Sequence, residues 1–334
     1  MQRPGRYTEE EWRYLVEPWE HAWPEGWREI RDVRERWAST LRAICERHGL
    51  AFDEGYEYAF GSHAVYLFET FVVKIYARYS PVWYPREVEA LAVLGDEAEV
   101  HAPRLIGHDD ADRGTSGHPY IVIERLPGDP WRIIRDDSSE AERLAAVRQM
   151  ARAARAMHAV DVGRLRGFER SADEWVAKIH ARAAIAPGYL KGVLPDHLLA
   201  EVEPYLADHL DAITPDFTPT FISTDINSSN SLFVRDGDTV RMSGQVDYGD
   251  VEIGPLEYEW PSVVQKALRH RPELVAAFFD AYGVELPFAD DVVRRLKVLS
   301  LLHRFPTLES FAEEHPEARS LDELLELQWA CTRR

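Results

Sequence analysis

The feature that most constrains this sequence is an acid, an amide and a second acid between Thr220 and Asp250. Asp225 precedes Asn230 by five residues, and Asp247 follows after two short apolar runs. Phosphoryl transfer needs a carboxylate beside the attacking hydroxyl and hard oxygen ligands that hold Mg²⁺ against the phosphates. Asp225 has the chemistry for the first role, and Asn230 and Asp247 have it for the second.

The two apolar runs predict a β-hairpin that brings these side chains together. They are Ser231 to Val234 and Val240 to Val246, and the turn signal Asp236-Gly237 lies between them. Short runs rich in β-branched and aromatic residues on either side of Asp-Gly are typical of antiparallel strands.

Length and cysteine content indicate a globular protein of a reducing compartment. The chain has 334 residues, enough for one large domain or two lobes, and 45% of them are hydrophobic. The sequence has neither an apolar run long enough for a membrane span nor a signal-peptide core at its start. Cys45 and Cys331 are isolated, so we expect a cytoplasmic protein without a cysteine zinc site.

The formal net charge of −19 argues against nucleic acid as a partner, because backbone phosphates would be repelled. It is compatible with a cationic small-molecule substrate. Acidic surfaces are common in soluble proteins, however, so charge alone does not identify the substrate. The sequence leaves open whether the protein is a monomer or a homodimer.

The first part of the chain predicts a helical extension over residues 1–50 followed by a small, strand-rich lobe. From Ile30 to His48 the apolar residues recur at helical spacing, with Gly49 as the stop. Pro85 to Leu94 has helical spacing as well, with proline at its start. The expected strands are Tyr56 to Phe60, Ala64 to Phe68, Phe71 to Tyr76, Arg104 to Gly107 and Tyr120 to Glu124.

Leu126-Pro127-Gly128 breaks the regular pattern, and a helical lobe is expected after it. We therefore predict an α+β, bilobal chain with an N-terminal lobe over residues 1–127 and a C-terminal lobe over 128–334. Glu140 to Val160 is the longest amphipathic segment. Further helices are expected over Glu257 to Leu268, Pro272 to Tyr282, Asp290 to Leu302 and Leu321 to Trp329.

The strand-rich lobe contains a lysine in an apolar strand that needs an anionic partner. Lys74 lies in the run Phe71 to Tyr76, where an ammonium group is costly unless it meets a phosphate or an acid. Glu87 follows thirteen residues later and is a candidate. Upstream, Gly61-Ser62 suits a turn over phosphates, since glycine allows close backbone approach. An edge-strand lysine and an ordinary turn are the alternative interpretations.

In this order, the residues resemble the aminoglycoside phosphotransferase family, whose members have the protein-kinase-like fold. The resemblance covers roughly residues 50–310. The family's His-Gly-Asp-x-x-x-x-Asn loop corresponds to Ser223 to Asn230, and its apolar-Asp-aromatic-Gly metal motif to Val246 to Gly249.

The resemblance implies a role for each matching residue. Asp225 would orient or deprotonate the acceptor hydroxyl, Asn230 and Asp247 would hold Mg²⁺, and Lys74 would contact the phosphates of ATP or GTP, braced by Glu87. The remaining nucleotide contacts implied are Gly61 and Ser62 over the phosphates, the backbone of Glu124 and Leu126 at the base, and Ile123 behind it.

The sequence departs from the family pattern at two supporting positions. Ser223 stands where the family has histidine, which leaves the orientation of the Asp225 loop less secure. In the later Gly-Asp-Pro-x-Tyr-Asp motif, Pro255 replaces the first acid and Glu259 replaces the second. The three residues assigned to the base and the metal are retained, which favours an active enzyme. A nucleotide-binding regulatory protein without transfer activity is the alternative that Ser223 supports.

The sequence indicates the acceptor molecule less specifically than it indicates phosphoryl transfer. Trp131-Arg132 and Leu301 to Phe305 resemble the hygromycin B kinase branch, whereas Arg241 to Asp247 is similar to kinases of cationic peptide antibiotics such as viomycin. We expect an aminoglycoside or aminocyclitol hydroxyl. Kinases of choline, fructosamine or methylthioribose share the same core and remain alternatives. Candidate acids for a cationic substrate are Asp250, Glu252, Glu257, Glu309, Glu313 and Glu314.

Overall fold

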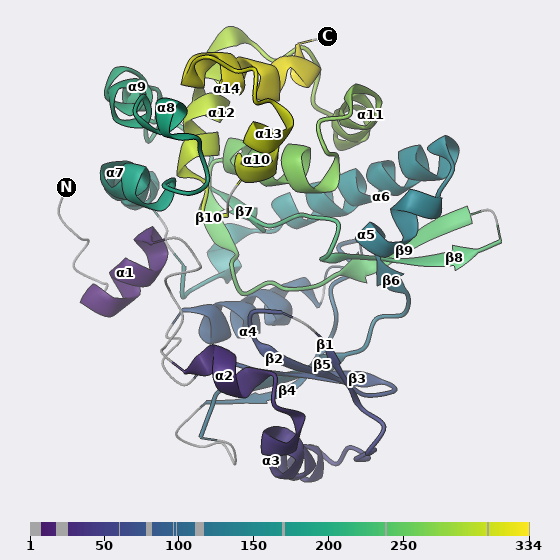
Figure 1. The fold of residues 1–334 in the computed structure, drawn as a ribbon. Coiled ribbons are helices and arrows are strands. Elements are labelled where there is room, and N and C mark those ends of the chain that lie inside the picture. The colour runs from purple at the N-terminus through teal and green to yellow at the C-terminus, as the bar shows by residue number, and fades with distance from the viewer. Residues whose placement is uncertain are drawn as a thin grey trace.

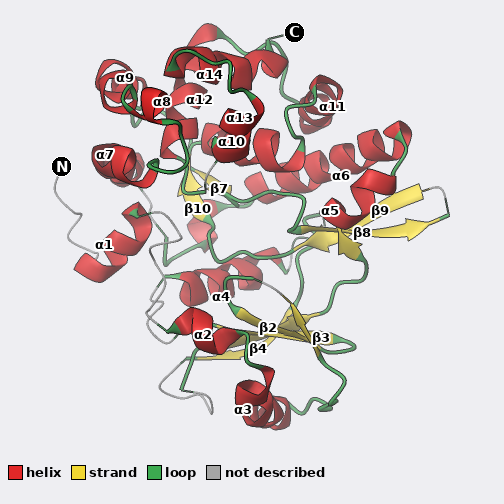
Figure 2. Ribbon diagram, in the orientation of Figure 1, coloured by secondary structure: helices red, strands yellow, loops and turns green. Residues whose placement is uncertain are grey.

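A small sheet-based lobe and a larger helical lobe make up the molecule (Figures 1 and 2). The computed structural model describes residues 8–17, 26–59, 61–77, 82–95, 97, 99–110, 117–168, 171–237, 239–305 and 307–333. Residues 1–7 and 18–25 of the expected helical extension, and Phe60 at the end of the first expected strand, lie outside these ranges. The α+β architecture expected from the sequence is confirmed.

The small lobe is a five-stranded antiparallel sheet with the order β1-β2-β3-β5-β4. The last pair, β4 and β5, contains a register shift between Leu105 and Gly107. The five strands agree with the runs expected from the sequence and are β1 (Glu57–Ala59), β2 (Ala64–Leu67), β3 (Phe71–Ile75), β4 (Leu105–Asp109) and β5 (Tyr120–Glu124).

Alternation along β3 and β5 gives the sheet two different faces. Val73 and Val122 pack with helix α3 (Arg34–Arg47), and the short α2 (Trp27–Arg31) joins the same cluster. Ile121 and its register partner Lys74 belong to the other face, where α4 (Trp83–Leu94) lies between the sheet and the large lobe (Figure 1). The sheet therefore presents Lys74 toward α4 and the large lobe.

Helix α1 (Glu9–Val16) contacts both α4 of the small lobe and the large lobe. Tyr14 packs edge-on against Trp83 of α4, with ring centroids 5.6 Å apart. Leu15 and Val16 offer their carbonyl oxygens to the guanidinium of Arg182, at 2.7 and 3.2 Å. The first helix thus follows α4 and the large lobe rather than the sheet.

The large lobe contains two short strand groups that carry the acid and amide residues. β8 (Ser231–Asp236) and β9 (Thr239–Gln245) form the predicted hairpin, and Gly237 adopts a positive φ of 58° in its turn. The strand β6 (Asp129–Pro130) extends this hairpin. β7 (Thr220–Ile222) pairs with β10 (Glu252–Gly254), so the segments after β7 and before β10 lie side by side.

Helices of the large lobe lie around the β7–β10 pair, whereas the β8–β9 hairpin projects at the edge of the lobe (Figure 2). Four of the helices expected from the sequence form with matching or nearly matching ends, namely α6 (Glu140–His158), α11 (Pro272–Tyr282), α12 (Asp290–Leu302) and α14 (Leu321–Trp329). The sequence did not single out α5 (Trp131–Ile134), α7 (Ala172–Tyr189), α8 (Asp196–Leu199), α9 (Val202–His209) or α13 (Glu309–Glu314).

The helix expected over residues 257–268 is broken into three pieces. A 3₁₀ turn (Leu256–Glu259) leads into α10 (Trp260–Ser262) and then a π-helical turn (Val263–Ala267). Pro261 has no backbone N–H to continue the preceding turn, which accounts for the change of pitch there. Arg269 and His270 then adopt positive φ angles of 52° and end the segment.

We predict that Arg182→Met destabilises the protein by about 3 kcal/mol, because Arg182 is only 1% exposed and its loss leaves buried carbonyl groups without a donor. Urea unfolding followed by tryptophan fluorescence measures the change. The matched control is Arg319→Met, since the Arg319 side chain is 88% exposed. Equal stabilities of the two variants would contradict the docking of α1 through Arg182.

Candidate active site

A buried lysine joins the two lobes through two carboxylates. The ammonium of Lys74 lies 2.6 Å from an Oε of Glu87 on α4 and 2.6 Å from an Oδ of Asp247 beyond β9. Lys74 and Glu87 are 6% and 1% exposed. The sequence predicted the Lys74–Glu87 pairing as one possibility, and the structure forms it.

The two carboxylates favour the charged form of Lys74. Burial alone lowers the pKa of Lys74, but Asp247 and Glu87 outweigh burial and raise the pKa above its ordinary value. Burial raises the pKa of Glu87, and Lys74 opposes that rise. Glu87 also accepts hydrogen bonds from the Tyr76 hydroxyl at 2.5 Å and from the Tyr248 N–H at 3.3 Å. The Glu87 carboxylate therefore accepts hydrogen bonds from both lobes.

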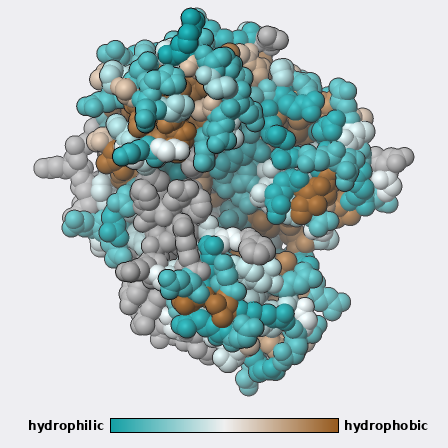
Figure 3. Space-filling view, viewed as in Figure 1, coloured by the Kyte–Doolittle hydropathy of each residue, from teal (hydrophilic) through white to brown (hydrophobic). Residues whose placement is uncertain are grey.

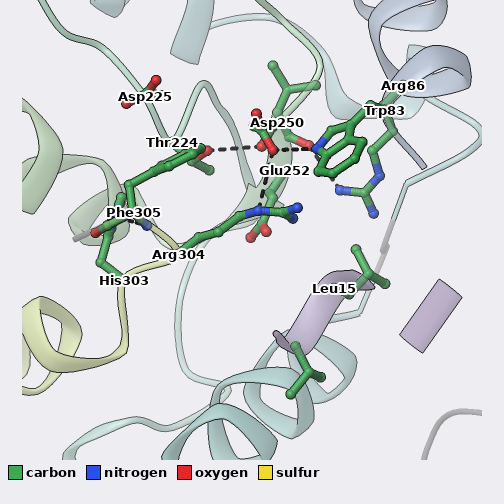
Figure 4. Close-up of polar contacts among 12 residues, drawn as sticks. Leu15, Trp83, Arg86, Thr224, Asp225, Asp250, Glu252, His303, Arg304 and Phe305 are labelled. Atoms are coloured by element: carbon green, nitrogen blue, oxygen red, sulfur yellow. Dashed lines mark hydrogen bonds and ion pairs between the residues drawn. The ribbon is translucent and has the colours of Figure 1, made fainter. Parts of the chain in front are cut away.

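The loop after β7 places Asp225 beside Asn230. The amide nitrogen of Asn230 donates to a carboxylate oxygen of Asp225 at 3.1 Å and to its carbonyl oxygen at 3.2 Å. Thr224 adopts a positive φ of 63°, and its hydroxyl donates to the Asp250 carbonyl at 2.9 Å (Figure 4). Since the amide nitrogen is engaged by Asp225, the amide oxygen of Asn230 is the atom left for a cation.

Two further residues contact Asp225 that sequence reasoning missed. The ammonium of Lys266 lies 3.2 Å from a carboxylate oxygen of Asp225, and the Ser262 hydroxyl lies 3.4 Å from the same oxygen. Both come from the broken helix between residues 256 and 268. No sequence motif marks them, because an unbroken helix was expected there and the contact depends on the π-helical turn.

Glu259 holds the backbone of the Asp225 loop. Its carboxylate accepts from the Ser223 N–H at 2.7 Å and from the His158 ring at 3.3 Å. The Ser223 hydroxyl accepts from the Gln245 amide at 3.2 Å. Serine in place of the family's histidine therefore leaves this loop anchored through a main-chain group.

One carboxylate oxygen of Asp250 has two partners within the protein. The Trp83 indole N–H donates to its carboxylate at 2.7 Å, and the Arg304 guanidinium lies 3.4 Å from the same oxygen (Figure 4). Burial raises the pKa of Asp250, and Arg304 opposes the rise. These contacts join α4 to the loop after Asp247, and the substrate contact expected for Asp250 stays a prediction.

Two other acids proposed for the substrate lie elsewhere. Glu252 is fully buried and hydrogen bonded to the ammonium of Lys178, so placing it in the substrate site was wrong. Glu257 pairs with Arg295 at 2.7 Å and lines a different cavity.

The remaining nucleotide-site residues lie along the edge of the small lobe. Ser62 offers its carbonyl to the Trp27 indole at 3.0 Å, and Gly61 has open space on its Cβ side among the described residues. Glu124 donates its N–H to the Arg104 carbonyl at 2.9 Å, and Ile123 is 6% exposed. Across the described part of the chain, no partner is recorded for the Leu126 N–H.

A cavity of about 540 Å³ opens beside the Asp225 loop. It reaches Lys266, the residue that contacts Asp225, and it includes Glu309 of α13. Figure 3 shows the molecule hollowed between its lobes, with mainly hydrophilic side chains around the hollow. The lining residues are Arg135, Asn227, Ser228, Ser229, Gln265, Lys266, Arg269, His270, Glu309, Ser310, Glu313 and Glu314.

The donor set near Asp225 fits a magnesium ion that is shared with phosphates. Asn230 and Asp247 supply hard oxygen atoms, and Mg²⁺ usually takes one or two protein ligands together with phosphate and water. Within the described ranges, no group of three or more His, Cys, Asp or Glu side chains is arranged as a metal site.

Also within those ranges, no helix is long and apolar enough to cross a membrane.

Comparisons with known proteins give relatives in sequence and in fold. The viomycin phosphotransferase of Streptomyces vinaceus is 29% identical over 222 residues, which cover 62% of this chain and 69% of that protein. The GDP and kanamycin complex of APH(2")-IIia superposes with a TM-score of 0.61 at 14% identity, covering 87% of this chain and 96% of that one. A Streptomyces rimosus aminoglycoside phosphotransferase with ADP and streptomycin gives 0.52 at 18%, covering 80% and 98%.

The profile of the phosphotransferase enzyme family, abbreviated APH, matches residues 58–296. This range contains Lys74, Glu87, Asp225, Asn230 and Asp247. The chain therefore belongs to the phosphotransferase enzyme family.

Proposed function

We propose that the protein transfers the γ-phosphoryl group of ATP or GTP to a hydroxyl of a small antibiotic-like molecule, with an aminoglycoside or aminocyclitol of the hygromycin B kind as the first candidate. The observation that carries the proposal is the position of Asp225. Asn230, a proposed metal ligand, contacts one of its oxygens, and Lys266, which lines the neighbouring cavity, contacts the other.

Asp225 orients the acceptor hydroxyl and takes its proton. The hydroxyl oxygen forms a bond to the γ-phosphorus, the bond from that phosphorus to the bridging oxygen breaks, and the nucleoside diphosphate leaves with the electron pair. Catalysis of this kind rests on positioning and charge neutralisation. Mg²⁺, when bound by Asn230 and Asp247, neutralises charge on the phosphates.

The small lobe holds the nucleotide. Lys74 offers its ammonium to the phosphates, and Glu87, 2.6 Å away, holds that ammonium in place. The backbone carbonyl of Glu124 and the N–H of Leu126 face the base, with Ile123 as the apolar wall. Gly61 and Ser62 cover the phosphates.

A cationic peptide antibiotic is the second candidate acceptor. Its support is the 29% identity to a viomycin phosphotransferase, together with the local likeness around Asp247. Both candidates are polar hydroxylated compounds that carry cationic groups, and Glu309, Glu313 and Glu314 of the cavity suit such groups.

The direct test is Asp225→Asn in a nucleotide-coupled assay with hygromycin B, kanamycin, streptomycin and viomycin as acceptors. We expect phosphorylated product with the wild type and a fall of about 10³-fold in kcat for the variant. The ADP-induced rise in melting temperature should persist in the variant, which shows that it is folded. Asp236→Asn, at the exposed hairpin turn, is the control. Full activity of Asp225→Asn would contradict the assigned base.

We also predict that the main chain of Ser223, not its hydroxyl, matters for activity. Ser223→Ala keeps the N–H bond to Glu259 and should cost about 1 kcal/mol in unfolding free energy, with kcat within about threefold of wild type. Glu259→Ala removes the acceptor of a buried N–H and should lower kcat by about tenfold or more. Steady-state rates and urea unfolding check both variants. A larger kcat loss in Ser223→Ala than in Glu259→Ala would reverse the assignment.

A further inference from the structure

Lys266 brings a positive charge to the proposed base from the large lobe. Its ammonium lies 3.2 Å from Oδ1 of Asp225, and the Ser262 hydroxyl lies 3.4 Å from the same oxygen. Ser262 ends α10, and Lys266 lies in the π-helical turn that follows. The broken helix therefore contacts the carboxylate of Asp225 through one charged and one neutral side chain.

The ammonium of Lys266 has hydrogen-bonding capacity that the protein leaves open. Within the described ranges, Asp225 is the one acid within 4.0 Å of it, whereas Lys74 and Lys297 each have two acid partners. The other neighbour of the ammonium is the face of the Phe305 ring, with the centroid at 4.5 Å. An ammonium carries three N–H donors. Because Lys266 also lines the cavity, a ligand there can accept a hydrogen bond from it.

The charge of Lys266 suits an anion better than it suits the acceptor. The proposed acceptors carry cationic groups, which the ammonium repels. The Lys266 side chain is 26% exposed, so its ion pair with Asp225 contributes little stability by itself. The anionic group that comes to the acceptor hydroxyl during the reaction is the γ-phosphoryl group, whose oxygens carry negative charge in the transition state.

The contacts of Asp225 place the transferred group close to Lys266. In the described part of the chain, Oδ1 is contacted by Lys266 and Ser262, and Oδ2 by Asn230 alone. A hydroxyl that donates to this carboxylate lies about 2.7 Å from its oxygen, and the phosphorus that it attacks lies about 3 to 3.5 Å from the hydroxyl. A flexible lysine side chain that ends 3.2 Å from the same carboxylate can reach the oxygens on that phosphorus.

We infer that Lys266 is a further catalytic residue, whose ammonium donates a hydrogen bond to a nonbridging oxygen of the γ-phosphoryl group while Asp225 holds the acceptor hydroxyl. The ammonium keeps its protons throughout: the hydroxyl proton goes to Asp225, and the bond that breaks is the one to the nucleoside diphosphate. A cation beside the base is compatible with this reaction, because positioning and charge neutralisation dominate it. The inference rests on the proposed function, since it takes Asp225 as the residue beside the acceptor hydroxyl.

Steady-state kinetics of Lys266→Met, with the best acceptor of the panel, give the first test. We expect kcat to fall about 10²-fold and both KM values to stay within about threefold, because the lost hydrogen bond is strongest during transfer. Lys266→Arg keeps the charge and should recover part of the rate. Lys191→Met is the matched control and should behave as the wild type, because Lys191 is exposed and does not line the cavity.

Nucleotide affinity separates a phosphoryl contact from an effect on Asp225 alone. Isothermal titration calorimetry with Mg²⁺ compares ADP with AMPPNP, which adds an uncleaved γ-phosphoryl group; GDP and GMPPNP serve if the protein binds guanine nucleotides. We expect Lys266→Met to weaken AMPPNP about fivefold relative to ADP, the size of one partly exposed ion pair. Unchanged ADP affinity shows that the variant is folded. Ser262→Ala removes the neutral neighbour of the same Asp225 oxygen and should leave the ratio as in the wild type.

An unchanged ratio in Lys266→Met would overturn the inference, as would an equal shift in Ser262→Ala or a wild type that binds neither nucleotide. A higher acceptor KM with unchanged kcat would also overturn it, because Lys266 would then contact the acceptor. Failure of the proposed function is seen separately. In that case no acceptor is phosphorylated in an Asp225-dependent manner, although the effect of Lys266→Met on the AMPPNP to ADP ratio persists.

Discussion

The arrangement of the two lobes depends on the buried ammonium of Lys74, which has a carboxylate partner in each lobe. Lys74 comes from the sheet, Glu87 from α4 and Asp247 from the large lobe, with both ion-pair distances at 2.6 Å. An ammonium that is only 6% exposed is stable only with close anionic partners. Removal of Asp247 leaves Lys74 with an anionic partner from its own lobe alone, so the position of one lobe on the other is coupled to the residues assigned to the metal and phosphates.

Helix α4 makes further hydrogen bonds across the boundary between the two lobes. Besides Glu87, it contributes Trp83, which donates to Asp250, and Arg86, which donates to the Val251 carbonyl at 3.0 Å. The segment after Asp247 is therefore held at several successive residues. Asp247 itself has a positive φ of 71°, a conformation that costs a non-glycine residue free energy and persists only when its neighbours fix it.

Sequence patterns predicted the parts of the fold that depend on residues close together in the chain. The hairpin that carries Asn230 and Asp247, the strand with Lys74 and the helices α11, α12 and α14 follow from residue periodicity and turn chemistry. The docking of α1 on Arg182 could not be predicted, because it joins residues 166 and 167 positions apart in the chain. The contact of Lys266 with Asp225 was missed because it requires a π-helical turn after Pro261, which helical periodicity does not indicate. Glu252 was misplaced because its burial partner, Lys178, lies in a helix that the sequence did not single out.

Asp247 is the residue proposed to hold Mg²⁺ beside the nucleotide, and the Mg²⁺ dependence of nucleotide affinity tests that assignment most directly. Calorimetric titration of ADP, with Mg²⁺ and with EDTA, gives the factor by which Mg²⁺ strengthens binding. We predict that Asp247→Asn lowers this factor to near one, whereas Lys74→Met weakens ADP binding in both conditions and keeps the factor. An undiminished Mg²⁺ effect in Asp247→Asn would contradict the account.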